Sequence, residues 1–217
     1  MALNRCEDAP KRGRPLQMTA LERETVILDA AERVLLEQGL TGTTMAAVAG
    51  AAGMSKRTLY AVFDGRTALF AGVLRRLRVR VVRPLDPPDL GLPLPDRLRR
   101  LLGPDLAPGI CAAPLELLRA TLAEATSDSD LVELLLEEGP RTFRREIRKE
   151  LDRAVKRGEI RLSDTGKAAE LLLDMALPCT LEDLLCKGCG VADEVGSIRE
   201  RIDLAVDVFL SGADGRL

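Results

Sequence analysis

The chain contains no histidine and no tryptophan, and aromatic residues make up only 2% of it. Histidine is the most common general base in enzymes, so its absence removes the usual way of activating a serine or cysteine nucleophile. No glycine-rich phosphate-binding loop is present either. We therefore expect a protein that is not an enzyme, although chemistry with a cysteine and a carboxylate remains formally open.

Long apolar segments are also missing. No uncharged apolar run reaches the roughly 18 residues that a membrane-spanning helix needs. The N-terminus carries Arg5, Glu7 and Asp8 followed by basic residues, which is not the pattern of a signal peptide. We expect a cytoplasmic protein with no membrane partner.

Cysteine is present without the spacing of a disulfide framework, because the chain has five cysteines, an odd number. In a reducing cytosol such residues stay free thiols. Cys179, Cys186 and Cys189 form a C-x6-C-x2-C cluster, but a tetrahedral zinc site would need a fourth ligand from Cys111, Cys6 or a carboxylate. We expect inert thiols and no metal or cofactor. Redox or electrophile sensing is the stronger alternative, and metal binding is the weaker one.

Leucine and alanine dominate the 46% of the chain that is apolar. Both residues favour helix, and the scarcity of aromatic and β-branched runs argues against a sheet, so the predicted class is all-α.

Charge is divided unevenly, since residues 1–83 hold 14 Lys/Arg and 8 Asp/Glu while the remainder has a net charge of −8. The total of −2 therefore hides a basic N-terminal part that suits a polyanionic partner.

Residues 43–63, TTMAAVAGAAGMSKRTLYAVF, have the pattern of a helix-turn-helix. A small residue, Ala49, stands where two helices cross at close range, and Gly53 stands at the turn, where a positive φ is often needed. Ser55 to Thr58 are left pointing outward at the start of the second helix, as in a helix that reads the major groove. The alternative is an alanine-rich helical hairpin inside a core.

The stretch from Ile27 to Leu74, ILDAAERVLLEQGLTGTTMAAVAGAAGMSKRTLYAVFDGRTALFAGVL, resembles the tetracycline-repressor (TetR) family of bacterial transcriptional regulators. The resemblance runs from about Thr19 to Leu74 and is much less specific beyond it. It implies an N-terminal three-helix helix-turn-helix domain and a larger C-terminal helical domain for ligand binding and dimerisation. It also implies a homodimeric repressor that a small molecule releases from DNA.

We expect a flexible basic arm over residues 1–18, a DNA-binding domain over 19–65 and a ligand-binding and dimerisation domain over 66–217, with a helix over 66–82 linking the two domains. Thr19 and Glu22 form a capping box that predicts the start of the first helix, and Gly39 predicts its end. Five prolines between Arg83 and Pro95 end the linking helix. Further helices are predicted over 96–102, 114–125, 130–157 with a kink at Pro140, 163–177 and 195–210.

The partner expected for the first domain is a near-palindromic double-stranded DNA operator. Lys56, Arg57 and Thr58 are expected to reach base edges or nearby phosphates. The family resemblance adds Tyr60, Thr44 and Arg66 as backbone contacts, although many members have lysine where this chain has Arg66, and Ala61 and Val62 replace larger side chains. The full predicted set is Thr43, Thr44, Ser55, Lys56, Arg57, Thr58, Tyr60 and Arg66, with Lys11, Arg12 and Arg14 of the arm.

Two charged surfaces near this domain are not expected to contact DNA. The arginines at the far end of the linking helix, Arg75, Arg76, Arg78 and Arg80, are expected on a solvated interdomain surface rather than at bases. The polar face of the first helix is interpreted as solvated, and it carries Glu24, Asp29, Glu32, Arg33 and Glu37.

The C-terminal part carries two further sets of residues. The expected lining of an effector pocket is Leu101, Leu118, Leu122, Leu135, Phe143, Ile147, Met175 and Cys179, although a single residue at such helical spacing is more often ordinary core. An apolar or weakly polar effector follows from this lining. The expected dimer interface is Leu172, Ala176, Ile198, Ile202, Ala205, Val206 and Phe209, and the alternative is that both helical faces lie inside one protomer.

The function predicted from the sequence is a homodimeric repressor whose affinity for DNA falls when a small molecule binds. A thiol-sensing regulator and a DNA-binding activator without a ligand are the alternatives.

Overall fold

The computed structural model describes residues 18–103, 129–177 and 194–214, and within these ranges every regular element is a helix, which confirms the all-α class. The helix predicted over 114–125 lies outside the described residues. The elements are α1 (Ala20–Gly42), α2 (Met45–Ala51), α3 (Lys56–Tyr60), α4 (Arg66–Val81), the 3-10 helix η1 (Pro87–Gly91), α5 (Leu94–Leu102), α7 (Ser129–Leu136), the π-helix η2 (Glu137–Arg141), α8 (Thr142–Lys156), α9 (Thr165–Ala176) and α11 (Glu194–Asp214).

Helix α1 begins and breaks where its local signals predict. Thr19 Oγ1 accepts a hydrogen bond from the Glu22 N–H at 3.2 Å, and Glu22 Oε2 accepts one from the Thr19 N–H at 2.7 Å. The hydrogen bond from the Thr19 backbone, with a second from its hydroxyl, holds the pKa of Glu22 below its ordinary value. Gly39, at φ 71°, breaks the helix, and a short continuation reaches Gly42.

A first core joins α1, α2, α3 and α4. Ile27, Val48 and Leu59 are all 0% exposed and lie at its centre. Ala49 is buried where α2 meets the other helices, and Gly53 has a φ of 64° in the turn before α3. The small residue and the glycine of the helix-turn-helix pattern therefore have the positions predicted for them.

Phe63 is buried in the same core. Its ring lies against Gly72 of α4, where an added Cβ would be 2.9 Å from Phe63 Cε1 and 3.1 Å from Leu28 Cδ2. A glycine inside a helix costs about 0.5–1 kcal/mol relative to alanine. The close approach of α4 to the aromatic ring explains why a glycine occupies this position.

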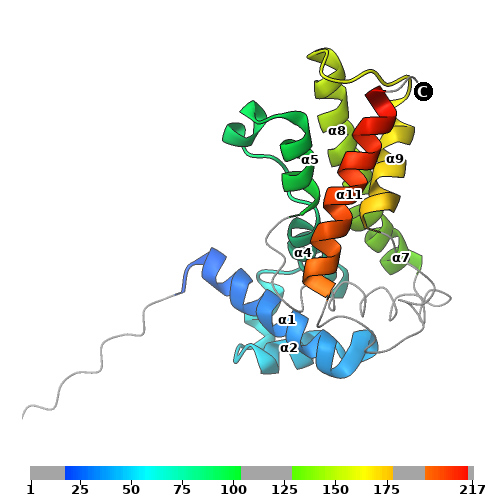
Figure 1. Cartoon of the computed structure of the whole chain (residues 1–217). Coiled ribbons are helices and arrows are strands. Elements are labelled where there is room, and N and C mark those ends of the chain that lie inside the picture. The colour runs from blue at the N-terminus through cyan, green and yellow to red at the C-terminus, as the bar shows by residue number, and fades with distance from the viewer. Residues whose placement is uncertain (1–17, 104–128, 178–193, 215–217) are drawn as a thin grey trace, which may run out of the picture.

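Packing divides the described residues into two cores, which lie toward opposite ends of the molecule (Figure 1). Helix α4 contributes Leu77 to the first core, whereas Val82, just after the helix, belongs to the second. Helix α7 packs on the first core through Leu131, although it follows α5 in the sequence, and α8 belongs to the second core through Ile147. The chain therefore passes between the cores near Val82 and again through η2.

The crossing at η2 is irregular, which confirms the kink predicted at Pro140. Gly139 has φ −106° and ψ −107°, outside the helical region, and Pro140 has no N–H to donate. Segments of π-helix are usually single turns within longer α-helices, and here one separates α7 from α8.

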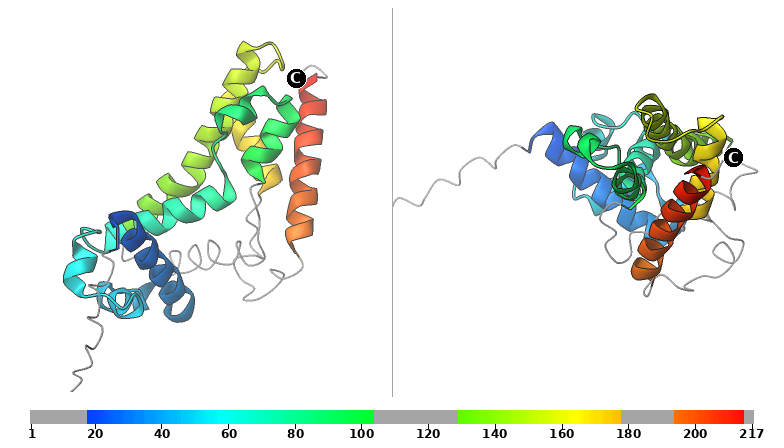
Figure 2. Two further views of the ribbon diagram at one scale, coloured as in Figure 1. Left: turned by 90° about the vertical axis from the view of Figure 1, so that its left-hand side faces the viewer. Right: turned by 45° about the horizontal axis from the view of Figure 1, so that its top comes forward.

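The second core is built from α5, α8, α9 and α11. Helix α9 packs against both α8 and α11, and α5 packs against α8 and α11 (Figure 2). Asp164 caps α9 by accepting hydrogen bonds from the N–H groups of Lys167 at 3.0 Å and Gly166 at 2.9 Å, which hold the pKa of Asp164 below its ordinary value. None of the described helices is long and apolar enough to cross a membrane.

Candidate nucleic-acid interface

Helix α3 has one buried side and one exposed side. Leu59 is 0% exposed and anchors the helix in the first core. Lys56, Arg57 and Tyr60 are exposed, with 53% of the tyrosine accessible. Two cations and one phenol are thus presented from little more than one helical turn.

Ser55 and Thr58 determine where α3 starts. Ser55 Oγ accepts a hydrogen bond from the Thr58 N–H at 3.1 Å and lies 2.8 Å from Thr58 Oγ1. An N-cap of this kind stabilises a helix by about 1 kcal/mol. The structure therefore gives both predicted contact residues a local role in placing Lys56 and Arg57.

The adjacent threonines before α2 have opposite environments. Thr44 is exposed, and its Oγ1 accepts a hydrogen bond from the Ala47 N–H at 3.1 Å, so it caps α2. Thr43 is 0% exposed, and its hydroxyl donates to the carbonyl oxygen of Gly39 at 2.7 Å. The predicted DNA contact by Thr43 is wrong, because its side chain is turned into the protein.

Arg66, the first residue of α4, is half-buried. Its Nη2 donates to the carbonyl oxygen of Leu40 at 2.8 Å, and its guanidinium carbon lies 5.2 Å from the centre of the Phe70 ring. The side chain is therefore held against the end of α1 rather than extended into solvent.

Arginines of α4 are paired with carboxylates of α1. Arg76 forms ion pairs with Asp29 and Glu32, and Arg80 Nη1 lies 2.9 Å from Glu32 Oε2. The interpretation of this face as solvated is confirmed for Asp29, whose side chain is 54% exposed, but it is wrong for Glu32, whose side chain is only 13% exposed. Helical periodicity located the polar face but gave no sign that arginines of α4 cover Glu32.

The same α4 surface also reaches η2. Arg78 Nη1 donates to Glu138 Oε2 at 2.5 Å, and Arg75 Nη1 lies 4.0 Å from Glu138 Oε1. With the pairs to α1, these contacts place the arginines between α1 and η2, but Arg76, Arg78 and Arg80 are half-buried in ion pairs and not solvated as predicted.

Sequence reasoning missed one contact inside the helix-turn-helix. Arg33 of α1 donates from Nη2 to the carbonyl oxygen of Ala51, the last residue of α2, at 2.9 Å. The basic residues of the predicted arm, Lys11, Arg12 and Arg14, lie outside the described residues.

Two family models match the chain. The C-terminal domain of AefR-like transcriptional repressors matches residues 97–212, which is more than half of the chain, and the model of bacterial regulatory proteins of the tetR family matches residues 27–73. The chain belongs to the TetR family. It is therefore a DNA-binding transcriptional regulator with an N-terminal helix-turn-helix, and members of this family are regulators rather than enzymes.

Solved structures similar to the chain are TetR-family regulators as well. One from Agrobacterium tumefaciens is 28% identical, with a TM-score of 0.64, over 87% of this chain and 93% of that one. The flavonoid-responsive regulator FrrA is 27% identical, with a TM-score of 0.58, over 88% of this chain and 96% of that one. No curated protein matches the chain.

The residues predicted to line an effector pocket in this TetR-family regulator are not all brought together. Leu101 and Ile147 are buried in the second core, and Phe143 and Met175 pack against it half-buried. Leu135 instead packs against the first core. Leu118, Leu122 and Cys179 lie outside the described residues.

The predicted dimer interface is turned inward. Six of its seven residues are buried within the second core, and the seventh packs against that core half-buried: Leu172, Ala176, Ile202, Ala205, Val206 and Phe209, with Ile198. The six buried side chains meet other helices of the same protomer, which is the alternative given for these faces, whereas a dimer contact by the half-buried Ile198 stays a prediction. Among the side chains of α9 and α11 whose burial is described, the exposed large apolar ones are Leu171 at 60%, Leu204 at 64% and Val208 at 52%.

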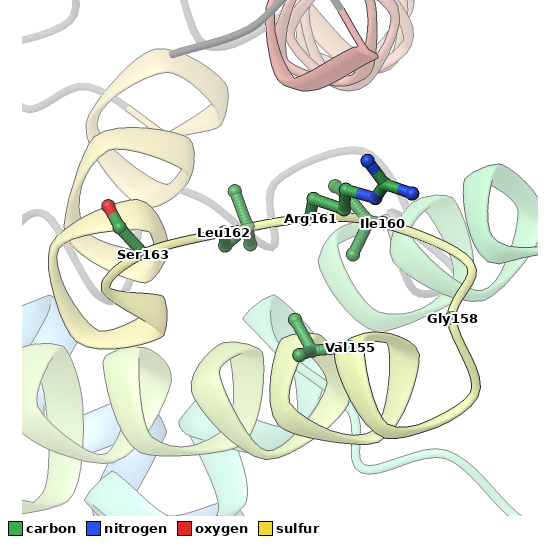
Figure 3. A pocket seen from close by; sticks show the side chains of 6 residues that line it. All are labelled: Val155, Gly158, Ile160, Arg161, Leu162 and Ser163. Atoms are coloured by element: carbon green, nitrogen blue, oxygen red, sulfur yellow. The ribbon is translucent and has the colours of Figure 1, made fainter.

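A hollow of about 450 Å³ opens at the turn between α8 and α9, where Val155 extends from α8 toward the segment that follows (Figure 3). Its lining is Val155, Gly158, Ile160, Arg161, Leu162 and Ser163, none of which was predicted for an effector pocket.

In the part of the chain that the structure describes, no group of three or more Cys, Asp or Glu side chains could hold a metal ion. Cys186 and Cys189 lie outside that part, as Cys179 does.

Proposed function

We propose that this TetR-family regulator is a homodimeric repressor that binds a near-palindromic DNA operator and leaves it when a small apolar molecule binds. The observation that carries the proposal is the two-sided packing of α3. Its Leu59 is fully buried, while Lys56, Arg57 and Tyr60 are exposed on a rigidly anchored turn. The similarity of the C-terminal part to AefR-like transcriptional repressors supports repression rather than activation.

The exposed groups divide into two roles. Arg57 and Lys56 are cations at the start of α3, the part of a recognition helix that enters the major groove, and an arginine fork suits the O6 and N7 atoms of guanine. Tyr60 and Thr44 are exposed hydroxyl groups at the ends of α3 and α2, and hydroxyl groups commonly bind phosphate oxygens. Base contacts select the sequence, whereas phosphate contacts set the general affinity.

This division predicts different losses in Arg57→Ala and Tyr60→Phe. The arginine variant should lose about 1–3 kcal/mol of discrimination between operator and other DNA, because a base contact is removed. The tyrosine variant should weaken binding to all duplexes about equally. The measurement is a mobility shift with a duplex that the wild-type protein selects from a random library and with a scrambled duplex of the same composition.

Arg161→Ala is the matched control, since Arg161 is exposed at the turn between α8 and α9 and its replacement also removes one positive charge. It should bind both duplexes like the wild type. If Arg57→Ala binds both duplexes with wild-type affinity, Arg57 does not read the operator. A wild-type protein that selects no sequence from the library would refute the DNA-binding mechanism proposed for α3.

The surface proposed for the second copy is the exposed side of α9 and α11. Leu204 and Val208 lie one turn apart on α11, Leu171 lies on the neighbouring α9, and all three are more than half exposed. Packing these two helices against their symmetry mates would form a four-helix interface of a common kind. It would also place two α3 helices on one duplex, which a near-palindromic operator requires.

The effector is proposed to bind in the helical C-terminal part. The similar regulator FrrA is flavonoid-responsive, which supports a planar aromatic compound of that class as the first effector to test. A flavonoid panel added to the complex with the selected duplex should include members that release the DNA in proportion to their concentration. If no member releases it, the proposed effector class is wrong, although DNA binding itself would stand.

A further inference from the structure

The helices of the helix-turn-helix lack a common stabilising feature at their C-terminal ends. Neither α1 nor α2 has a basic residue in its last turn. The C-terminal end of a helix carries a partial negative charge on its free carbonyl groups, and a nearby cation stabilises it. In both helices the cation comes from another helix, because Arg66 of α4 donates to Leu40 and Arg33 of α1 donates to Ala51.

The surroundings of Arg66 fix the direction of its side chain. It stands at the N-terminal end of α4, where the helix dipole repels a positive charge, and its N-cap Gly65 provides no side-chain hydrogen bond. The guanidinium lies over the Phe70 ring at 5.2 Å, its Nε atom is buried, and Nη2 donates to Leu40 at 2.8 Å. Electrostatics and packing thus both direct the charge toward the end of α1.

The hydrogen bond from Arg66 to Leu40 lies at the corner between α1 and α2, which is formed by residues 40–44. The carbonyl oxygen of Leu40 accepts a second hydrogen bond, from the Thr43 N–H at 3.1 Å. The next residue is Thr44, the N-cap of α2 and an exposed hydroxyl in the proposed DNA interface. Arg66 therefore links the start of α4 to the end of α1 and to the corner. Helices α2 and α3 pack against α1 and α4 in the same core, so their positions depend on this link.

We propose that Arg66 is a positioning residue for DNA recognition, which acts through the corner between α1 and α2 and not through a DNA phosphate. This inference rests on the DNA-binding role proposed for α3. A residue that positions α3 affects operator binding more than binding to other DNA, because only the operator complex needs α3 in register with the bases. A phosphate ligand would contribute to both complexes alike.

The test compares Arg66→Met with the wild type on the selected and the scrambled duplex. Methionine keeps a long apolar side chain against Phe70 while it removes the charge and the hydrogen bond to Leu40. Operator affinity should fall about tenfold, the expected effect of losing a hydrogen bond from a charged group, whereas affinity for the scrambled duplex should stay within about twofold. The salt dependence of binding to the scrambled duplex should remain that of the wild type.

Hydrogen exchange of the protein without DNA gives an independent readout. The amide protons of Thr43 and Thr44 should exchange faster in Arg66→Met than in the wild type, because the hydrogen bond from Arg66 to the Leu40 carbonyl oxygen no longer stabilises the corner. Loss of a phosphate ligand would not change exchange in the free protein. This readout, together with a far-UV circular dichroism spectrum, also shows whether the variant is folded.

Arg66→Lys tests the same point if the methionine variant does not fold. Lysine keeps the charge that a phosphate needs but lacks the flat guanidinium that lies on Phe70, so operator discrimination should fall here too. The proposal is overturned if lysine restores wild-type binding to both duplexes. It is also overturned if Arg66→Met weakens both duplexes equally, with a salt slope lower by about 0.9 per lost contact and unchanged exchange. In either case a wild-type protein that still selects an operator leaves the proposed function intact.

Discussion

At the scale of single residues, Arg97 of α5 shows how a charge is accommodated in the second core. It is 1% exposed, yet Nε donates to Glu150 Oε1 at 2.6 Å, Nη1 donates to the Leu92 carbonyl oxygen at 2.6 Å, and Nη2 pairs with Glu159. The hydrogen bond from Arg97 holds the pKa of Glu159 below its ordinary value. The rigid fork of an arginine can satisfy several acceptors at once, which suits this position.

Replacing Arg97 should therefore be costly. Arg97→Met removes one of the two arginines that pair with the buried Glu150 carboxylate and leaves it only Arg153, and breaking a buried ion pair from one side costs about 3–5 kcal/mol. The double variant Arg97→Met/Glu150→Leu should lose less than the single variant, because it also removes the buried carboxylate that Arg97 no longer pairs with, while Arg153, which loses its own partner, is more exposed. Urea unfolding at one fixed protein concentration measures both free energies.

Arg148→Met of α8 is the matched control for this prediction. Arg148 is 61% exposed, and its Nε lies 3.8 Å from Asp152 Oδ2, so its loss should cost less than about 1 kcal/mol. Equal losses in Arg97→Met and Arg148→Met would contradict the view that the buried ion cluster supports the second core.

Residue-level prediction from the sequence succeeded where the pattern itself fixed the environment. Gly53 and Ala49 have roles that follow from spacing alone, and the structure places both as expected. Thr43 and Thr44 were indistinguishable, because each is a good capping residue and only the tertiary fold turns the first inward. The hydrogen bond of Arg66 could not be predicted for a similar reason, because its acceptor, the carbonyl oxygen of Leu40, is 26 residues away in the sequence.

At the scale of helices, the ends that could be predicted are those with a local cause. The capping box at Thr19, the positive φ of Gly39 and the proline series after α4 act within a few residues, and each has the predicted effect. Pro140 likewise produced the expected irregularity. The short 3-10 helix Pro87–Gly91 was not predicted, although it has a local cause in the capping box of Asp86 and Asp89; the prolines of this stretch were interpreted only as the end of α4.

Helical periodicity was correct about which faces of α9 and α11 are apolar but wrong about what covers them. A stripe of buried residues such as Leu172 and Val206 has the same sequence pattern whether its partner is in the same chain or in a second one. The residues now proposed for the interface, Leu171, Leu204 and Val208, are scattered apolar positions on the outer faces. Only their exposure in the folded chain distinguishes them from core.

At the scale of the whole molecule, the proposed dimer gives a direct prediction. Leu204→Glu places a charge at the centre of the proposed interface, and burying an unpaired charge is far more costly than the apolar contact that it replaces. The mass in solution should fall from twice that of the chain to once. Multi-angle light scattering after size exclusion, at several protein concentrations, measures this change.

Leu36→Glu is the control, because Leu36 is also an exposed leucine, at 53%, but lies on α1. This variant should keep the mass of the wild type. If Leu204→Glu keeps it as well, the dimer is not formed through this face of α11. A wild-type chain that is monomeric at all concentrations would refute the proposed homodimer itself.

Helix α7 has a consequence for how such regulators can be recombined. The core beneath the DNA-reading helices takes Leu131 from α7, with Leu134 and Leu135 packed beside it, so it is assembled from two separate stretches of the sequence. In a hybrid that joins residues up to Val82 to the C-terminal part of another family member, the α7 of that other protein would pack poorly on the first core. A hybrid should therefore be more stable when α7 of this chain is transferred together with its helices α1 to α4, which requires two junctions instead of one.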